Sequence, residues 1–296
     1  MIRFSHTVFA LPFALLGVFL AGEGGTGGFP GWGKLSLIVW CMACARSAAM
    51  AFNRIVDRHI DARNPRTAGR ELPSGKLTLR QATWFLWLCA LGFGIGCALF
   101  KYPLGSWFGY GNIWPIVFAV PVLVFICLYS LTKRFTSASH FWLGASLGLA
   151  PLSAWAAVSP PAGPLVAWEG VVLALAVLFW TAGFDIIYAL QDVEADRREG
   201  LYSLPARFGV TEALWTSRLC HSLTITCLLL LVRFTALGGL FTAAVVVTAG
   251  LMLIEHGLVR GGRTSRMALA FGTINGIISI LLAAAGIIDL LWNPTS

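Results

Sequence analysis

Long apolar segments recur along the whole chain, separated by short polar stretches. Backbone polar groups in lipid must be satisfied within their own segment, and the weak alternating pattern of a transmembrane β-barrel is absent. The pattern therefore predicts an all-α, polytopic membrane protein, folded as a single domain over residues 1–296, with nine transmembrane helices around a central cavity. The spans lie near residues 4–21, 35–52, 82–100, 113–131, 141–158, 166–190, 213–232, 235–257 and 267–291.

Composition and charge strengthen this interpretation and give it an orientation. Only 11% of the residues are charged and 57% are hydrophobic, whereas soluble domains carry about 25% charged residues. In the nine-helix scheme 17 of the 21 Lys and Arg residues lie on one side and three, Lys34, Lys101 and Arg233, on the other. This bias predicts that the N-terminus and the basic loops are cytoplasmic, in a multi-pass protein of the cell inner membrane. Its basic face suits membrane lipid or an anionic substrate, and nucleic acid is not an expected partner.

Two acidic motifs stand at the ends of predicted spans. The first motif comprises Asn53, Asp57 and Asp61, and the second comprises Asp185, Asp192 and Asp196. On a helix, the side chains of the first motif would spread over about 80° around the helix axis. Those of the second would spread over about 40°. Like charges on one helix face repel one another unless cations bridge them. Oxygen ligands with no accompanying His or Cys pattern suit Mg²⁺, which binds a few carboxylates, water and substrate phosphate. The motifs therefore predict a site for Mg²⁺ with a diphosphate.

The chain also repeats an order of features. Each acidic motif is followed by a basic loop, a Leu-Pro pair and a Trp-bearing segment, at residues 72–84 and again at 204–215. The offset of about 132 to 139 residues corresponds to four helices, and membrane repeats of this kind often place a substrate site between the halves. This four-helix echo predicts that the two acidic motifs face each other.

These segments resemble the UbiA superfamily of intramembrane aromatic prenyltransferases. NRIVDRHID at 53–61 is similar to the family's first Asn-Asp-x-x-Asp-x-x-x-Asp motif, and RTAGRELPSG at 66–75 is similar to the loop after it. DIIYALQDVEAD at 185–196 resembles the second motif, and YSLTK at 129–133 resembles the family's Tyr-x-x-x-Lys element. The resemblance covers essentially the whole chain. One departure is Arg54, where the family usually has Asp, which leaves one fewer carboxylate near the first metal site.

The resemblance implies an activity and a set of site residues. It implies transfer of a polyprenyl chain from polyprenyl diphosphate to an aromatic ring in ubiquinone or menaquinone biosynthesis, by Mg²⁺-assisted diphosphate ionisation and electrophilic aromatic substitution. The sequence is most similar to enzymes that act on 4-hydroxybenzoate or a related hydroxynaphthoate. The implied metal ligands are Asn53, Asp57, Asp192 and Asp196, with Asp57, Asp61, Asp185, Asp192 and Asp196 catalytic. The implied substrate-binding residues are Arg63, Arg66, Arg70, Tyr129, Lys133 and Tyr188.

A single arginine lies inside a predicted span. Arg46 precedes Asn53 by two helical turns, about 10 Å deeper and within about 20° of the same face, so it is expected to point into the cavity. An arginine inside a span costs about 2.5 to 3.5 kcal/mol and therefore needs a partner. That partner is the carboxylate of the aromatic acceptor, the diphosphate, or an acid or carbonyl of the protein itself.

A different class of function also fits part of the pattern. A cation- or proton-coupled membrane transporter could use intramembrane acids as a relay, and an internal echo is common among transporters. Their sites lie near the bilayer midplane, however, whereas both acidic motifs lie at one membrane face beside basic loops. The sequence therefore favours prenyl transfer and keeps transport as the alternative.

Overall fold

The computed structural model describes residues 7–22, 29–102, 111–158, 166–259 and 269–292, and these residues contain helices, turns and loops without a strand. The helices of the N-terminal half are α1 (Thr7–Gly22), α2 (Trp32–Val56), α3 (Arg58–Arg63), α4 (Leu79–Leu99), α5 (Trp114–Thr132) and α6 (Ser139–Val158). Those that follow are α7 (Trp168–Ala189), η3 (Leu190–Asp192), α8 (Val193–Arg198), α9 (Leu204–Phe208), α10 (Val210–Phe234), α11 (Gly239–Leu258), η5 (Leu269–Ile274) and α12 (Asn275–Trp292).

The predicted all-α membrane fold is confirmed. Eight helices of the described chain are long and apolar enough to cross a membrane. The count differs from nine because α1, which corresponds to the predicted span 4–21, is a shorter apolar helix of 16 residues. Residues 4–6 of that predicted span lie outside the described residues.

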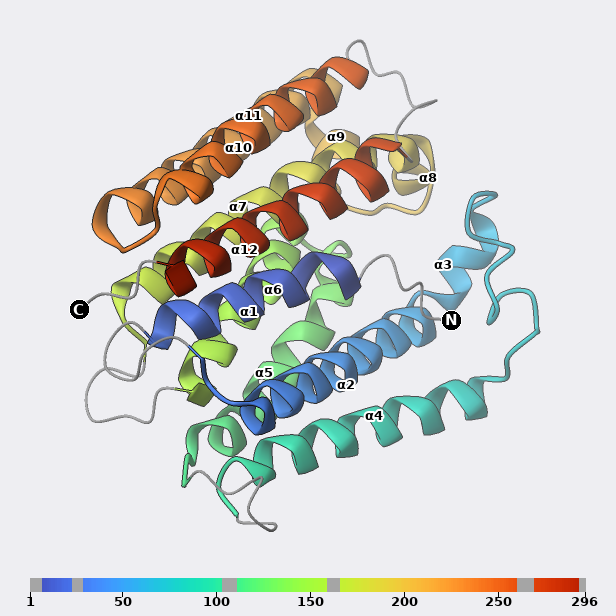
Figure 1. The fold of residues 1–296 in the computed structure, drawn as a ribbon. Helices are drawn as coiled ribbons and strands as arrows, with labels where there is room; N and C mark the ends of the chain where they lie inside the picture. Colours follow the sequence, from blue (N-terminus) through green and yellow to red (C-terminus); the bar gives the residue numbers. More distant parts are fainter. Residues whose placement is uncertain (1–6, 23–28, 103–110, 159–165, 260–268, 293–296) are drawn as a thin grey trace.

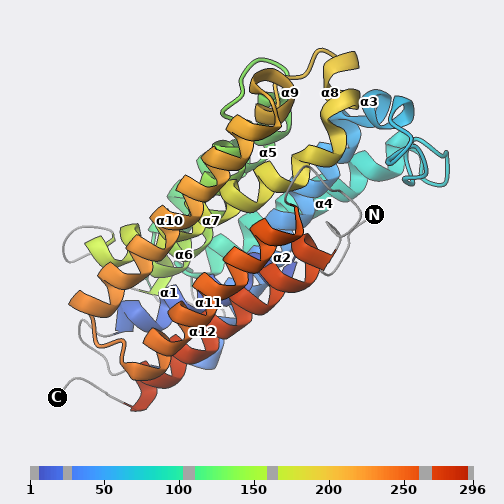
Figure 2. The ribbon, with the colours of Figure 1, turned by 90° about the horizontal axis from the view of Figure 1, so that it is seen from above.

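The long helices lie side by side in one bundle, and the short helices gather at one end of it. Figures 1 and 2 both place α3, α8 and α9 at the same end, whereas α12 finishes at the opposite end. Since α3 follows α2 and α8 follows α7, both acidic motifs lie at this end. The prediction that they share one face of the membrane protein therefore agrees with the fold.

The order of packing repeats in the two halves. In the first half α2 packs on α4, α4 on α5 and α5 on α6; in the second, α7 packs on α10, α10 on α11 and α11 on α12. The additional helix, α1, packs against both α6 and α12. This repetition agrees with the predicted four-helix echo, and it makes α2 and α7 the equivalent helices that carry the two motifs.

Close packing of α6 on α7 fixes the register between the halves. A Cβ atom on Gly144 would lie 2.3 Å from the Leu178 carbonyl oxygen, and one on Gly148 would lie 2.7 Å from that of Ala174. Only glycine permits backbones to approach this closely, a common device between membrane helices. One helical turn before Gly144, the same approach brings His140 beside the end of α7.

Neither acidic motif lies on one uninterrupted helix, so the prediction that each presents a single straight face was wrong. α2 ends at Val56 and α3 begins at Arg58, with Asp57 between them. In the second motif the 3₁₀ turn η3 separates α7 from α8. The helix is thus interrupted within each motif, and the acids of each motif have different partners.

Candidate functional site

A polar cavity of about 300 Å³ lies at the end of the bundle that carries α3 and α8. Its walls come from α2 and α3 with the loop after them, from α5 and the start of α6, and from α7 to α8. Both halves of the chain thus contribute, which agrees with the prediction that the motifs face each other. The predicted site residues that line it are Asn53, Asp61, Arg63, Arg66, Arg70, Tyr129, Lys133, Asp185, Tyr188, Asp192 and Asp196.

A second, larger cavity of about 630 Å³ adjoins the first and is mostly apolar. It extends among α1, α2, α4, α5, α6 and α7. Six residues line both cavities and so mark the boundary between them: Asn53, Arg70, Tyr129, Leu143, Asp185 and Tyr188. The molecule therefore combines a polar, charged cavity at the end of the bundle with an apolar cavity inside the bundle.

Arg46 lines the apolar cavity together with Asn53, as its position two turns deeper predicts. Its Nε atom is buried and has no hydrogen-bond partner within the described residues. Arg46 also makes no ion pair with a described carboxylate, unlike Arg63, Arg66 and Arg70 of the polar cavity. A buried guanidinium nitrogen without an acceptor is costly.

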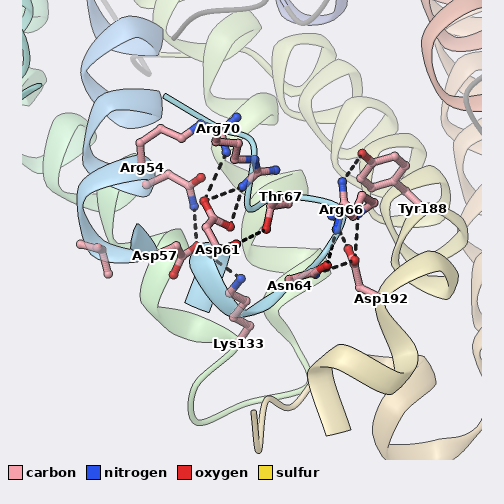
Figure 3. Close-up of polar contacts among 12 residues, drawn as sticks. Arg54, Asp57, Asp61, Asn64, Arg66, Thr67, Arg70, Lys133, Tyr188 and Asp192 are labelled. Carbon is pink, nitrogen blue, oxygen red and sulfur yellow. Dashed lines mark hydrogen bonds and ion pairs between the residues drawn. The ribbon is translucent and has the colours of Figure 1, made fainter. Parts of the chain in front are cut away.

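Asp57 lies behind the wall of the polar cavity and does not line it. Its side chain is 3% exposed and is paired with Lys133 Nζ at 3.3 Å and Arg134 Nη2 at 3.0 Å. Asn53 Nδ2 donates to the same carboxylate at 3.0 Å. These contacts join the end of α2 to the end of α5, and Figure 3 shows Lys133 directed at this acid. Arg134 was not predicted as a site residue.

Asp61 is held by two arginines at the cavity wall. Arg70 Nη1 lies 2.7 Å from both carboxylate oxygens, and Arg54 Nη1 lies 3.9 Å from one of them. Thr67 Oγ1 donates to the Asp61 carbonyl at 2.9 Å, so the loop after α3 folds back onto the helix. At the position where the family usually has an acid, Arg54 therefore provides a further cation for Asp61 (Figure 3).

Asp192 carries an ionic contact between the second motif and the loop after α3. Arg66 donates to it through Nε at 2.9 Å and Nη2 at 2.5 Å, while Arg66 Nη1 donates to the Tyr188 hydroxyl at 3.0 Å (Figure 3). Asn64 adds a hydrogen bond at 3.1 Å. Partial burial acts to lower the pKa of Arg66, but the hydrogen bonds to Asp192 outweigh it and raise that pKa above its ordinary value.

A second link between the halves lies at the rim. Arg63 Nε donates to Glu199 at 2.8 Å, and Nη2 of the same arginine also contacts this carboxylate. The hydrogen bond to Glu199 raises the pKa of the Arg63 guanidinium. Glu199 was missed in the sequence because it stands three residues beyond the last acid of the motif and continues no recognisable spacing.

Asp185 differs from these acids because its partner is a histidine. Its Oδ2 atom lies 2.7 Å from His140 Nδ1, and His140 Nε2 accepts a hydrogen bond from the Leu204 backbone N–H at 3.3 Å. His140 also lines the polar cavity. The sequence did not indicate this residue, since a lone histidine at the start of an apolar span has no distinguishing pattern.

The donor set of the polar cavity fits Mg²⁺ held mainly through a substrate. Five acids and five basic residues line it, so their formal charges balance: Asp61, Asp185, Asp192, Asp196 and Glu199 against Arg63, Arg66, Arg70, Lys133 and Arg198. Within the described residues no three His, Cys, Asp or Glu side chains are placed to hold a metal ion by themselves. Mg²⁺ commonly uses one or two carboxylates and takes its remaining ligands from water and phosphate. A strongly anionic diphosphate entering a charge-balanced cavity also needs added cations.

The UbiA prenyltransferase family model matches residues 10–271 of the sequence. The chain belongs to this family. Among its relatives, the 4-hydroxybenzoate octaprenyltransferase of Nitrosomonas europaea is 31% identical over 282 residues, covering 94% of this chain and 88% of the relative. The enzyme of the same name from Pectobacterium atrosepticum is 31% identical over 258 residues, covering 87% and 83%. Membership of the UbiA family favours prenyl transfer over the transporter alternative.

Solved structures of UbiA homologues share the fold. The apo structure of a homologue from Aeropyrum pernix K1 has a TM-score of 0.85 at 29% identity and covers 98% of this chain and 100% of its own. A homologue from Archaeoglobus fulgidus, bound to GPP and Mg²⁺, has a TM-score of 0.68 at 17% identity and covers 96% and 95%. The protein is therefore a polytopic membrane protein with the UbiA fold.

The different environments of Asp57 and Asp192 predict different effects on stability. Asp57→Asn should lower the free energy of unfolding by about 2 kcal/mol, the scale of hydrogen bonds to a buried charged group. Asp192→Asn should lower it by about 1 kcal/mol or less, because its ion pair is more exposed. Thermal unfolding in detergent, with EDTA and no substrate, measures both. Equal and negligible losses would show that Asp57 has no structural role.

Proposed function

We propose that this protein transfers a polyprenyl chain from polyprenyl diphosphate to an aromatic acid, 4-hydroxybenzoate or a related hydroxynaphthoate, in quinone biosynthesis. One observation carries the proposal: a charged cavity with both acidic motifs adjoins an apolar cavity that contains an unpaired arginine. The first suits a metal-bound diphosphate, and the second suits an isoprenoid chain and an aromatic carboxylate. The 4-hydroxybenzoate octaprenyltransferase relatives support this choice of acceptor.

The diphosphate belongs at the charged end. Asn53, Asp192 and Asp196 supply oxygen atoms on the cavity wall that could hold Mg²⁺, and Mg²⁺ when bound neutralises negative charge on the departing diphosphate. Arg66, Arg70 and Lys133 reach the same cavity and can donate hydrogen bonds to phosphate oxygens. Asp57, buried behind the wall, contributes by holding Lys133 in place.

Loss of diphosphate leaves an allylic cation that must be kept from water. The apolar cavity provides that shelter, and its walls come from helices that lie within the membrane. Tyr129 and Tyr188 stand at the boundary of the two cavities. Aromatic faces attract cations by about 0.5 to 2 kcal/mol, so both rings are placed to stabilise positive charge where the chain leaves its diphosphate.

The acceptor belongs beside Arg46. A guanidinium binds a carboxylate through two parallel hydrogen bonds, and the Nε atom of Arg46 lacks a protein partner in the described structure. Because Arg46 lies deeper than Asn53 on α2, a carboxylate bound there directs the rest of the aromatic ring toward the boundary residues. The ring would then meet the allylic carbon close to Tyr129 and Asp185.

The orientation in the membrane completes the proposal. The described basic segments between α3 and α4 and between α5 and α6 adjoin the end of the bundle that carries α3 and α8. The positive-inside rule favours the cytoplasm for this end. Bacterial relatives with the same octaprenyltransferase name support the cell inner membrane as the location. Water-soluble aromatic acids would then reach the polar cavity from the cytoplasm, while the prenyl substrate enters from lipid.

Activity should depend on a divalent cation and on the second motif. Membranes containing the protein, supplied with labelled polyprenyl diphosphate and a panel of aromatic acids, should form a prenylated product that EDTA abolishes and Mg²⁺ restores. Asp192→Asn should lower the rate by about 10²-fold or more, whereas Glu194→Gln, an exposed acid of α8, should not. Undiminished product in EDTA would exclude the metal, and no product with any acid would exclude the acceptor class.

Arg46→Lys should weaken binding of the aromatic acid more than binding of the prenyl diphosphate. A lysine keeps the charge but loses the planar pair of donors, so the apparent KM for the aromatic acid should rise about tenfold, the equivalent of roughly 1.4 kcal/mol. The KM for the prenyl diphosphate should change little. Arg218→Lys, on the exposed face of α10 against Trp215, is the matched control. Unchanged constants in Arg46→Lys would assign the acceptor's carboxylate to another residue.

Cysteine labelling should reveal the orientation. In a variant without the seven native cysteines, Ser74→Cys and Glu194→Cys should react with an impermeant maleimide only after the cytoplasmic side is opened. Arg233→Cys, near the end of α10, should react in intact cells. All three positions are exposed in the structure. Reaction of Ser74→Cys in intact cells would reverse the proposed orientation.

A further inference from the structure

The acids of the two motifs differ in what neutralises them. Asp57, Asp61 and Asp192 are each ion-paired with Lys or Arg. Within the described residues, Asp185 and Asp196 make no ion pair with either residue type. Of these two, only Asp185 lines both the polar and the apolar cavity. It is therefore the carboxylate without a cationic side-chain partner at the boundary where the two substrates meet.

His140 holds Asp185 in one orientation. Since His140 Nε2 accepts the Leu204 N–H, the proton of the neutral ring is on Nδ1, which donates to Asp185 Oδ2 at 2.7 Å. His140 is 4% exposed and is the second residue of α6, one turn before Gly144, whose close approach to Leu178 fixes α6 on α7. Asp185 Oδ1 makes no hydrogen bond within the described residues. One oxygen is therefore anchored and the other is available at the cavity boundary.

The proposed reaction needs a base at this boundary. The bond between the allylic carbon and the diphosphate oxygen breaks, and the diphosphate leaves with the electron pair. A carbon–carbon bond then forms to the aromatic ring, whose reacting carbon still carries its hydrogen. The ring regains aromaticity only when a base removes that proton and the C–H electrons return to the ring. A carboxylate whose lone pairs already bind arginine or lysine is a poor base, because protonation would break those contacts.

We infer that Asp185 accepts the ring proton through Oδ1 and that His140 is the residue that positions it. The proton can then pass from Asp185 to water or to the released diphosphate in the polar cavity, which Asp185 also lines. This assignment rests on the proposed function, because it needs an aromatic ring in the apolar cavity. It gives the acids of the second motif two roles. Asp192 and Asp196 serve the metal-bound diphosphate, and Asp185 accepts the ring proton.

Two variants of His140 distinguish a role in positioning Asp185 from a role in packing alone. His140→Leu removes the donor to Asp185, whereas His140→Gln keeps an N–H that can donate to it. The measurement is the rate with 4-hydroxybenzoate carrying deuterium at the two ring carbons beside the hydroxyl, relative to unlabelled acid. Proton removal should become slower in His140→Leu, so its deuterium isotope effect should exceed that of the wild type. His140→Gln should restore the wild-type isotope effect.

Asp185→Asn tests the base itself. Product formation should fall by about 10² to 10⁴-fold, the usual contribution of a general base, while prenyl diphosphate binding is retained. Diphosphate release should then exceed product formation, because cations that are not captured by the ring react with water. Thermal unfolding and binding of the prenyl diphosphate show whether each variant is folded. Because this variant leaves His140 in place, it tests proton removal even if His140→Leu does not fold.

The outcomes distinguish this inference from the proposed function. If the wild type prenylates none of the aromatic acids, the proposed function fails. If the wild type forms product but His140→Leu keeps the wild-type isotope effect, His140 has only a packing role and the positioning assignment is overturned. If Asp185→Asn forms product at the wild-type rate, another group removes the ring proton. A raised isotope effect in His140→Leu, corrected by His140→Gln, supports both assignments.

Discussion

Neutralisation of carboxylates at one end of an apolar bundle is the constraint on which the rest of the site depends. Charge within or beside a bilayer is costly unless it is paired, and three motif acids meet this requirement with Lys or Arg. The pairs also connect chain segments: Asp57 joins α2 to the end of α5, and Asp192 joins the second motif to the loop after α3. Ion pairing therefore builds the walls of the polar cavity as well as setting its charge.

A charge-balanced cavity has a consequence for substrate binding. A diphosphate must share arginines that already bind acids, so Arg66 would exchange part of its contact with Asp192 for phosphate oxygens, and Asp192 would exchange the arginine for Mg²⁺. Such an exchange keeps every charge paired as substrate enters and leaves. Asp57 takes no part in this exchange because it is buried and binds two cations. The acids that line the cavity are Asp61 of the first motif and the three acids of the second.

The sequence predicted the helical architecture and the residues that line the site better than it predicted the contacts between those residues. Apolar length alone predicts the spans. The two acidic motifs and the family resemblance together predicted eleven residues that line one cavity. The helix breaks at Asp57 and at η3 were not predictable, because the same spacing suits a straight helix and the turn depends on distant partners such as Lys133. His140 and Arg134 were missed for the same reason, since their roles arise from α5 and α6 packing on other helices.

The acids of the site have different partners, and this difference explains how one site can stabilise both the anionic diphosphate and the cationic intermediates. Departure of diphosphate needs cations, and Arg66, Arg70 and Lys133 supply them on the polar side. The allylic cation and the protonated ring need an uncompensated negative group, which a cavity lined only with ion pairs could not provide. Asp185 meets this need because a neutral histidine, and not an arginine, orients it. A cation in place of His140 would form an ion pair with Asp185 and would remove the base from the boundary where the ring must lose its proton.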